Sequence, residues 1–282
     1  MKAFLFITLQ RLLPHHLLSR MVGRLADWRM PAFLLQPLLR YFVRKFDIDM
    51  QIARRQELTS YKSFNEFFVR HLVASARPIG EGLVSPADGC ISQLGQILDG
   101  QILQAKGHYY HVSELLTTEC DFKGELQSGH FATIYLSPKD YHRVHMPCDA
   151  KLLYSIYVPG KLFSVNPTTV ENIEGVFANN ERLVNVFQTE YGPMAVVLVG
   201  AMLVAGIQTV WRGKITPNKL GQIKRWDYHQ QEVTFRKGDE LGHFNFGSTV
   251  ILLLPKDAPN LLEKWQASDA VQMGQTLARE LK

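Results

Sequence analysis

Several features that define other protein classes are missing from this sequence of 282 residues. Its three cysteines, Cys90, Cys120 and Cys148, form no C-x-x-C pair, which argues against a disulfide framework and against a structural zinc site. We expect all three to be small buried side chains in a protein of a reducing compartment. There is no low-complexity segment and no short repeat, so the chain is expected to form one large domain or one domain with an appendage.

A membrane-spanning run and a secretory signal are also missing from the N-terminal segment. Its longest charge-free run, Met30 to Leu39, has ten residues and two prolines. A spanning helix needs about 20 apolar residues, so this segment cannot cross a bilayer. Lys2 precedes a short apolar region, but Gln10 and Arg11 follow it where a signal peptide would have small residues at a cleavage site.

Positive charge is concentrated in this same segment. Residues 1–55 contain ten Lys or Arg against three acids, a net charge of +7, whereas the remaining residues contain 21 against 23, a net charge of −2. Apolar residues recur at helical spacing between the arginines, and Pro14, Pro31 and Pro37 are expected to break the segment into short helices. Two interpretations remain open: a helical pair packed on the core, or basic amphipathic helices that lie among the headgroups of an anionic membrane. We favour the second.

The pattern changes after residue 80. A capping box from Ser63 to Glu66 predicts a helix within residues 56–80, and Arg77 to Gly80 marks its exit. Short β-type runs then follow at 91–95, 101–105, 130–136, 151–158, 183–189, 194–199, 202–211, 232–236 and 249–254, with a hairpin link at Tyr191 to Pro193. We therefore expect an α+β protein, with a helical, membrane-associating region over 1–80, a β-rich catalytic core of barrel or sandwich type over 81–282, and a C-terminal helix after Pro255.

The candidate chemical residues lie far apart in the sequence. A serine nucleophile needs a base and a group that orients the base, and Asp88, His142, His145 and Ser248 supply these residue types. Each of them alone is more often an ordinary turn or core residue. His142 and His145 form an H-x-x-H pair, which could provide two metal ligands, but no H-E-x-x-H helix accompanies it, and we expect no metal.

Six motifs together are more specific than these residues. They occur in one order along nearly the whole chain, at residues 64–70 (FNEFFVR), 77–79 (RPI), 85–89 (SPADG), 137–147 (SPKDYHRVHMP), 159–166 (PGKLFSVN) and 246–249 (FGST). In this combination the chain resembles the bacterial phosphatidylserine decarboxylase proenzymes, which depend on a pyruvoyl group. The family commonly has Leu where this chain has Phe246, an apolar exchange that we expect to leave the chemistry unchanged.

The resemblance implies an enzyme that processes itself. Ser248 would attack the carbonyl of Gly247, with His145 as general base and Asp88 holding the imidazole. The products would be a large chain, 1–247, and a small chain, 248–282, that stay associated. Ser248 would become the covalent pyruvoyl cofactor. This group would form a Schiff base with phosphatidylserine and allow its decarboxylation to phosphatidylethanolamine. His142 would contact the substrate carboxylate or return the proton.

The expected partners follow from the same resemblance and from the charge pattern. They are phosphatidylserine in an anionic membrane and a second processed unit in a homodimer, with no nucleic acid. We expect a peripheral protein on the cytoplasmic face of the cell membrane. Two alternatives remain: a metal-dependent hydrolase that uses Asp88, His142 and His145 as ligands, and a non-enzymatic lipid-surface module in which Gly247 and Ser248 form only a turn.

Overall fold

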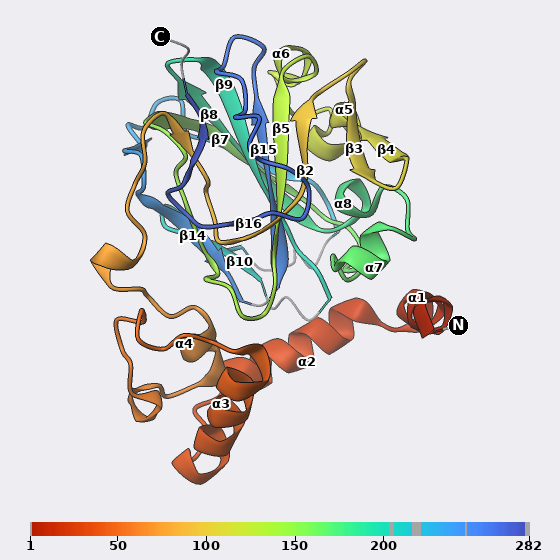
Figure 1. Ribbon diagram of the computed structural model, residues 1–282. Helices are drawn as coiled ribbons and strands as arrows, with labels where there is room; N and C mark the ends of the chain where they lie inside the picture. Colours follow the sequence, from red (N-terminus) through yellow and green to blue (C-terminus); the bar gives the residue numbers. More distant parts are fainter. Residues whose placement is uncertain (1, 203–205, 216–220, 246, 280–282) are drawn as a thin grey trace.

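The computed structural model describes residues 2–202, 206–215, 221–245 and 247–279, with side chains from residue 6 onward. It contains both helices and strands, and nearly all strand pairs are antiparallel. Figure 1 shows the first helices gathered at one end of the molecule and the sheets at the other. Residues 203–205 of the expected strand over 202–211, Phe246 and residues 280–282 lie outside the described residues.

Three helices form the N-terminal segment: α1 (Lys2–Leu12), α2 (His15–Asp27) and α3 (Ala32–Phe46). Pro14 and Pro31 separate them, as expected, because proline begins a helix more readily than it continues one. The expected break at Pro37 is wrong, since this residue lies inside α3. Proline removes the hydrogen bond to the carbonyl four residues earlier, that of Phe33, so α3 continues through Pro37 with one backbone hydrogen bond fewer.

The predicted helix after residue 56 is short. It is α4 (Phe64–Phe68), flanked by single turns at Leu58–Ser60 and Ala74–Ala76. The Ser63 hydroxyl accepts a hydrogen bond from the Glu66 amide at 3.1 Å, which confirms the first half of the capping box. The Glu66 carboxylate reaches the amide of Lys62 instead of that of Ser63, at 2.6 Å. This helix holds three phenylalanines that are buried against α3.

The strands form one large sheet and several small ones. The large sheet has the order β12-β7-β8-β9-β15-β5-β2-β16, with β13 beside β7, and a four-stranded sheet has the order β11-β10-β14-β6. The other pairs are β1 with β17 and β3 with β4. The strand bounds are β1 Leu83–Val84, β2 Gly89–Gln96, β3 Gln101–Ala105, β4 His108–His111, β5 His130–Leu136, β6 Arg143–His145, β7 Ala150–Val158, β8 Arg182–Thr189, β9 Gly192–Val199, β10 Ile207–Thr209, β11 Gly213–Ile215, β12 Lys224–Asp227, β13 Thr234–Phe235, β14 Glu240–Phe244, β15 Ser248–Leu254, β16 Ala270–Val271 and β17 Thr276–Ala278. Four further short helices are α5 Val112–Leu116, α6 Lys123–Leu126, α7 Pro167–Val170 and α8 Val176–Asn179.

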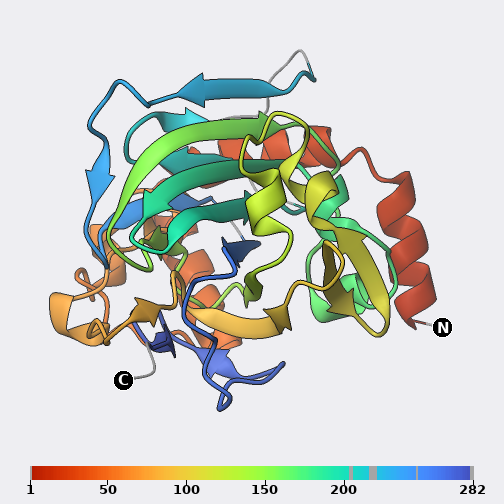
Figure 2. The same cartoon turned by 90° about the horizontal axis from the view of Figure 1, so that it is seen from above.

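Both faces of the large sheet are buried. In β15, Ile251 and Leu253 belong to one apolar cluster, and Val250, Leu252 and Leu254 belong to the other. Since successive side chains point to opposite faces, a strand covered on both sides is apolar throughout. The expected β-rich core is confirmed, but the described strands do not close into a barrel. The large sheet is a strongly curved open layer, as Figure 2 shows from above.

The predicted C-terminal helix is wrong. Within the described part of residues 255–279 the chain forms turns and the short strands β16 and β17. The Trp265 indole donates to the Thr276 carbonyl at 2.9 Å, and the Leu262 amide donates to the Leu277 carbonyl. The apolar residues at helical spacing in this segment are therefore packed by a chain that folds back along β17. Contacts within the protein override a weak local helical pattern.

The N-terminal helices contact the core through both apolar and polar groups, and Ile7 of α1 belongs to an apolar cluster of the core. The Gln10 amide accepts a hydrogen bond from the Ser164 backbone at 2.8 Å and donates one to the Thr169 hydroxyl at 3.1 Å. The His16 imidazole contacts the carbonyl of Gly160 at 2.9 Å. All three partners lie between β7 and β8, so this loop is the docking surface of α1 and α2.

All three cysteines are free thiols, as expected. The prediction that the cysteines are buried is confirmed for Cys120 and Cys148 and is wrong for Cys90, which is half-buried. Burial raises the pKa of the Cys148 thiol to about 12, so this side chain stays protonated at physiological pH.

Glu181, a buried acid on the same docking loop, gives a stability prediction. Its carboxylate accepts the Tyr157 hydroxyl at 2.9 Å, and burial raises its pKa to about 7. The folded chain therefore keeps a proton that the unfolded chain releases. The resulting stabilisation is fully present below the pKa of the unfolded chain and is lost as the pH rises through about 7. Glu181→Gln should remove this dependence of the unfolding free energy on pH.

Urea unfolding at each pH, with tryptophan fluorescence as the signal, measures the unfolding free energy. All chains in this experiment also carry Ser248→Ala. Between about pH 5 and about pH 8 the parent should lose roughly 1–3 kcal/mol more unfolding free energy than Glu181→Gln. The exposed Glu57, changed to Gln, is the matched control and should follow the parent. Parallel pH profiles for the parent and Glu181→Gln would contradict the prediction.

Candidate functional site

The candidate site lies where two connections run between the two main sheets. Residues 137–142 connect β5 to β6, and residues 245–247 connect β14 to β15. Since β15 pairs with β5 and β14 pairs with β6, both connections cross between the sheets at the same place. Ser248 is opposite Leu136 in the register, and the Phe244 amide donates to the His142 carbonyl at 3.1 Å. The fold thus brings the Gly247–Ser248 step next to the loop that carries His142.

Ser248 is the first residue of β15 and is fully buried. Its hydroxyl is covered and has no hydrogen-bond partner, which is costly for a polar group in a protein interior. Gly247 is half-buried, and a Cβ placed on it would meet only the Leu136 carbonyl oxygen, at an ordinary contact distance of 3.5 Å. A side chain could be accommodated at this distance, so packing alone does not require glycine at position 247.

His142 is a neutral imidazole with one free nitrogen. It is fully buried, its ring centroid lies 4.1 Å from that of Phe68, and its Nδ1 lies 2.8 Å from the Asp140 carbonyl. The carbonyl fixes the proton on Nδ1, so Nε2 carries the lone pair and has no partner. Burial lowers the pKa of His142 to about 3. This nitrogen can accept a proton or a hydrogen bond.

His145, on β6, has both ring nitrogens engaged. Nδ1 lies 2.8 Å from the Gly238 carbonyl, and Nε2 lies 3.1 Å from the Tyr141 hydroxyl. The carbonyl again fixes the proton on Nδ1, so Nε2 accepts the phenol proton. Burial is the main reason that the pKa of His145 lies below its ordinary value, and the Gly238 carbonyl acts in the opposite direction.

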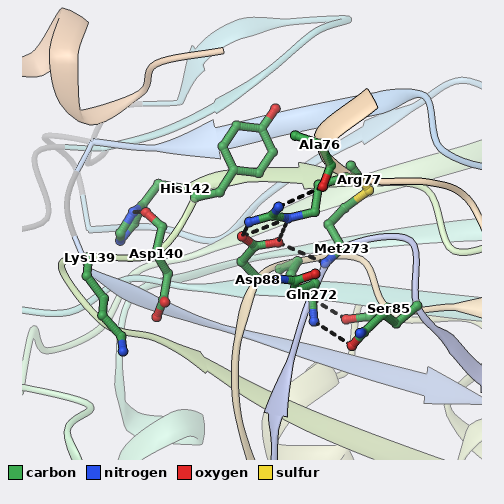
Figure 3. A network of polar contacts seen from close by, with 12 residues as sticks. Ala76, Arg77, Ser85, Asp88, Lys139, Asp140, His142, Gln272 and Met273 are labelled. Atoms are coloured by element: carbon green, nitrogen blue, oxygen red, sulfur yellow. Dashed lines mark hydrogen bonds and ion pairs between the residues drawn. The ribbon is translucent and has the colours of Figure 1, made fainter. Parts of the chain in front are cut away.

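Asp88 does not form the expected hydrogen bond to His145. Figure 3 shows its carboxylate against the guanidinium of Arg77, which donates from Nε at 2.9 Å and also from a terminal nitrogen. The amide of Met273 donates to the same carboxylate at 2.9 Å. Asp88 is nevertheless close to His145, because the His145 amide donates to the Pro86 carbonyl and the Asp88 charge raises the pKa of the imidazole.

Four groups at the site were not among the predicted functional residues: Arg70, Arg77, Asp140 and Tyr141. All of them occur in the motifs quoted above, which was the available signal. Asp140 accepts hydrogen bonds from the amide and the hydroxyl of Ser137, both at 2.7 Å, and burial raises its pKa. Arg143 donates to the Val69 carbonyl and pairs with Glu240, so it ties the exit of α4 to β14.

The ligand set of the metal-dependent alternative is not assembled. In the described parts of the chain, no three His, Cys, Asp or Glu side chains are grouped so as to hold a metal ion. The Asp88 carboxylate is held by Arg77, and both nitrogens of His145 have other partners.

Comparison with known proteins gives the same family as the motifs. A family model described as phosphatidylserine decarboxylase matches residues 64–279, and one described as PSD matches residues 5–47. The phosphatidylserine decarboxylase proenzyme of Azotobacter vinelandii is 50% identical over 285 aligned residues, which cover 99% of each chain. The proenzymes of Acidovorax ebreus and Vibrio cholerae are each 47% identical, over 95% and 97% of this chain and 95% and 98% of their own.

The first family model alone covers well over half of the chain, and these relatives match it over nearly its whole length. The resemblance seen in the motifs is confirmed, and the chain belongs to the phosphatidylserine decarboxylase family.

Proposed function

We propose that this chain is a proenzyme that cuts itself between Gly247 and Ser248 and then converts phosphatidylserine to phosphatidylethanolamine. The observation that carries the proposal is the Ser248 hydroxyl, which is buried without a partner directly after Gly247 and next to the histidine loop. An unpartnered buried hydroxyl is destabilising in a purely structural role. As a nucleophile, in contrast, it is close to the carbonyl that it attacks.

Self-cleavage begins with an acyl shift. The Ser248 oxygen attacks the Gly247 carbonyl carbon, the peptide C–N bond breaks, and an ester replaces the amide. The hydroxyl proton passes to His145 and from there to the departing amine of Ser248. Elimination then removes the α-proton of residue 248 and breaks the bond between its Cβ and the ester oxygen, so that chain 1–247 leaves with a carboxylate at Gly247. The resulting N-terminal dehydroalanine tautomerises to an imine, and its hydrolysis releases ammonia and leaves a pyruvoyl group at position 248.

His145 has the tautomer that a general base needs. Its Nδ1–H is held by the Gly238 carbonyl, so its lone pair is on Nε2. The Tyr141 hydroxyl occupies this lone pair, so proton transfer from Ser248 requires Tyr141 to release it. Asp88 acts through its charge, which favours the imidazolium that forms during the attack, while Arg77 holds the carboxylate in place.

The pyruvoyl group supplies a carbonyl that condenses with the amine of the substrate and withdraws electrons as carbon dioxide leaves. Position 248 fits such a group, because the buried Ser248 hydroxyl has no hydrogen-bond partner there. His142 contacts the substrate at this point and returns the proton to its α-carbon. Its neutral, unpartnered Nε2 would first take up the proton that the substrate ammonium loses when the amine condenses.

Helix α2 supports membrane association, because its large apolar side chains face outward. Leu17, Met21 and Leu25 are 51%, 52% and 53% exposed, whereas the buried residues of this helix are His15, Ser19, Gly23 and Ala26. On α3, Phe33 and Tyr41 are exposed, and Tyr41 lies beside Arg40 and Arg44. No helix in the described segments could span a bilayer. This combination suits a helix that lies in the interface of an anionic membrane, on its cytoplasmic face.

The organisation of the mature protein is part of the same proposal. Residues 1–80 are its membrane-associating region and residues 81–282 its catalytic core. After cleavage, chains 1–247 and 248–282 stay associated through β15, and two processed units form a homodimer.

A first prediction concerns processing. The purified protein should contain two chains, and the smaller should carry a blocked N-terminus without an amine. Ser248→Ala, Asp88→Asn and His145→Ala should remain uncut, because each removes a group needed for the acyl shift, whereas His142→Ala should be cut but should not decarboxylate. Denaturing gels and intact-mass analysis measure the first effect, and release of carbon dioxide measures the second.

The matched control for Ser248→Ala is Ser128→Ala, which removes an exposed hydroxyl in a turn and should be cut normally. A single uncut species from cells with decarboxylase activity would refute the cleavage proposal. Normal cutting of His145→Ala would remove this residue from the role of base.

A second prediction concerns the membrane. Changing Leu17, Met21 and Leu25 together to Ser should weaken binding to phosphatidylglycerol vesicles by at least about 100-fold, since each buried side chain of this size contributes roughly 1.5–3 kcal/mol. Co-sedimentation with the vesicles measures the affinity.

The matched control carries the same number of changes at exposed apolar residues elsewhere, Leu98, Tyr109 and Ile223, again to Ser. Its binding should equal that of the parent. Equal losses in the two triple variants would mean that α2 is not the membrane contact.

A further inference from the structure

Arg70 is a buried arginine that forms no ion pair with a carboxylate of the described residues. Its side chain is 4% exposed, and its Nε and one terminal nitrogen are covered without a hydrogen-bond partner. The remaining terminal nitrogen donates to the Lys139 carbonyl over a long 3.3 Å. A buried charge is costly unless it is paired and hydrogen-bonded, so this guanidinium has an unmet need for an anion.

The surroundings hold this guanidinium in place. Arg70 follows α4 directly, and its carbon Cζ lies 5.5 Å from the ring centroid of Phe67. Arg143 donates to the carbonyl of Val69 at 2.9 Å and so fixes the backbone just before Arg70. The position is built by buried residues of α4 and β6 and is not a flexible surface arginine.

The free guanidinium faces the candidate site. Its charge contributes to the lowered pKa of His142, after burial, and the neighbouring Phe68 packs on the His142 ring. The carboxylates of Asp88 and Asp140 are near enough to act on Arg70, but neither pairs with it. Asp88 is held by Arg77, and Asp140 by Ser137. No carboxylate of the described residues pairs with Arg70, which leaves its guanidinium open to an anion from a ligand.

We propose that Arg70 binds the phosphodiester of the phospholipid headgroup in the cut enzyme. This inference rests on the proposed function. A phospholipid with a serine headgroup offers two anions, a carboxylate and a phosphodiester. A guanidinium on the carboxylate would stabilise the group that must lose its charge as carbon dioxide leaves, and so would oppose the reaction. The phosphodiester keeps its charge from substrate to product, and its oxygens match the planar donor fork of arginine.

Cleavage explains how the headgroup reaches a guanidinium that is covered in the uncut chain. Phe244, at the end of β14, lies beside His142, because its amide donates to the His142 carbonyl. Cutting after Gly247 leaves the chain that follows Phe244 as a free end, which is no longer held by a covalent bond to Ser248. Arg70 is thus masked in the proenzyme and becomes available in the mature enzyme.

The test compares substrate and product in processed enzyme. Parent, Arg70→Lys, Arg70→Gln and Arg70→Met are first checked for two chains on a gel. For the processed variants, the KM for short-chain phosphatidylserine and the inhibition constant for short-chain phosphatidylethanolamine are then measured. The product retains the phosphodiester and lacks the carboxylate. Arg279→Met, which removes an exposed guanidinium that pairs with Glu81, is the matched control.

Arg70→Gln and Arg70→Met should raise both constants together, by about 10- to 100-fold, since a hydrogen-bonded charge contributes this much to binding. Arg70→Lys should raise both by less, because it keeps the charge without the fork. A rise in KM with an unchanged inhibition constant would assign Arg70 to the carboxylate and overturn the proposal. Unchanged constants, or a series in which no Arg70 variant is cut, would overturn it too. Decarboxylation by the parent tests the proposed function separately.

Discussion

The pairing of β15 on both of its edges is the constraint on which the rest of this structure depends. Its register joins seven residues to β5 and five to β9, and both of its faces are buried. A strand in this position has one possible register, because a shift by one residue would turn each apolar set to the opposite face. Ser248, at the start of the strand, is therefore fixed opposite Leu136. The loop that continues from Leu136 carries His142.

The titratable groups near Ser248 are each held by a partner in direct contact. Two imidazoles are held neutral by burial and oriented by backbone carbonyls, while the carboxylates of Asp88 and Asp140 are occupied by Arg77 and Ser137. A carbonyl orients a histidine without adding a charge that the apolar surroundings would have to stabilise. The site thus contains neutral bases next to an arginine that has no anion of its own.

The strands of the core could be predicted from the sequence, whereas the course of the chain between and after them could not. The run 130–136 coincides with β5, because a strand buried on both faces is marked by its composition alone. The short β6 and β14 carry no such pattern, since tertiary contacts define them. The C-terminal helix failed as a prediction for the same reason, and the predicted break at Pro37 failed because α3 continues through this residue.

The site was predictable as a set of residues but not as a set of contacts. Motif resemblance selected Asp88, His142, His145 and Ser248, and the fold brings the loop of His142 to Ser248 and Asp88 close to His145. Residue types cannot reveal that Arg77 occupies the carboxylate, or that Gly238, distant in sequence, orients the imidazole. Such partners depend on distances that only the folded chain defines.

The path of the last described residues has a consequence for the lifetime of the protein. From Ser248 onward the chain pairs in turn with β5 and β9, with β2 through β16 and with β1 through β17. If the bond before Ser248 is cut, assembly of this topology changes from a reaction within one molecule to an encounter between two. Strands already interwoven would hold, but a denatured mature enzyme would have to find its second fragment in solution. Its durability would then be set by the rate of unfolding and not by an equilibrium.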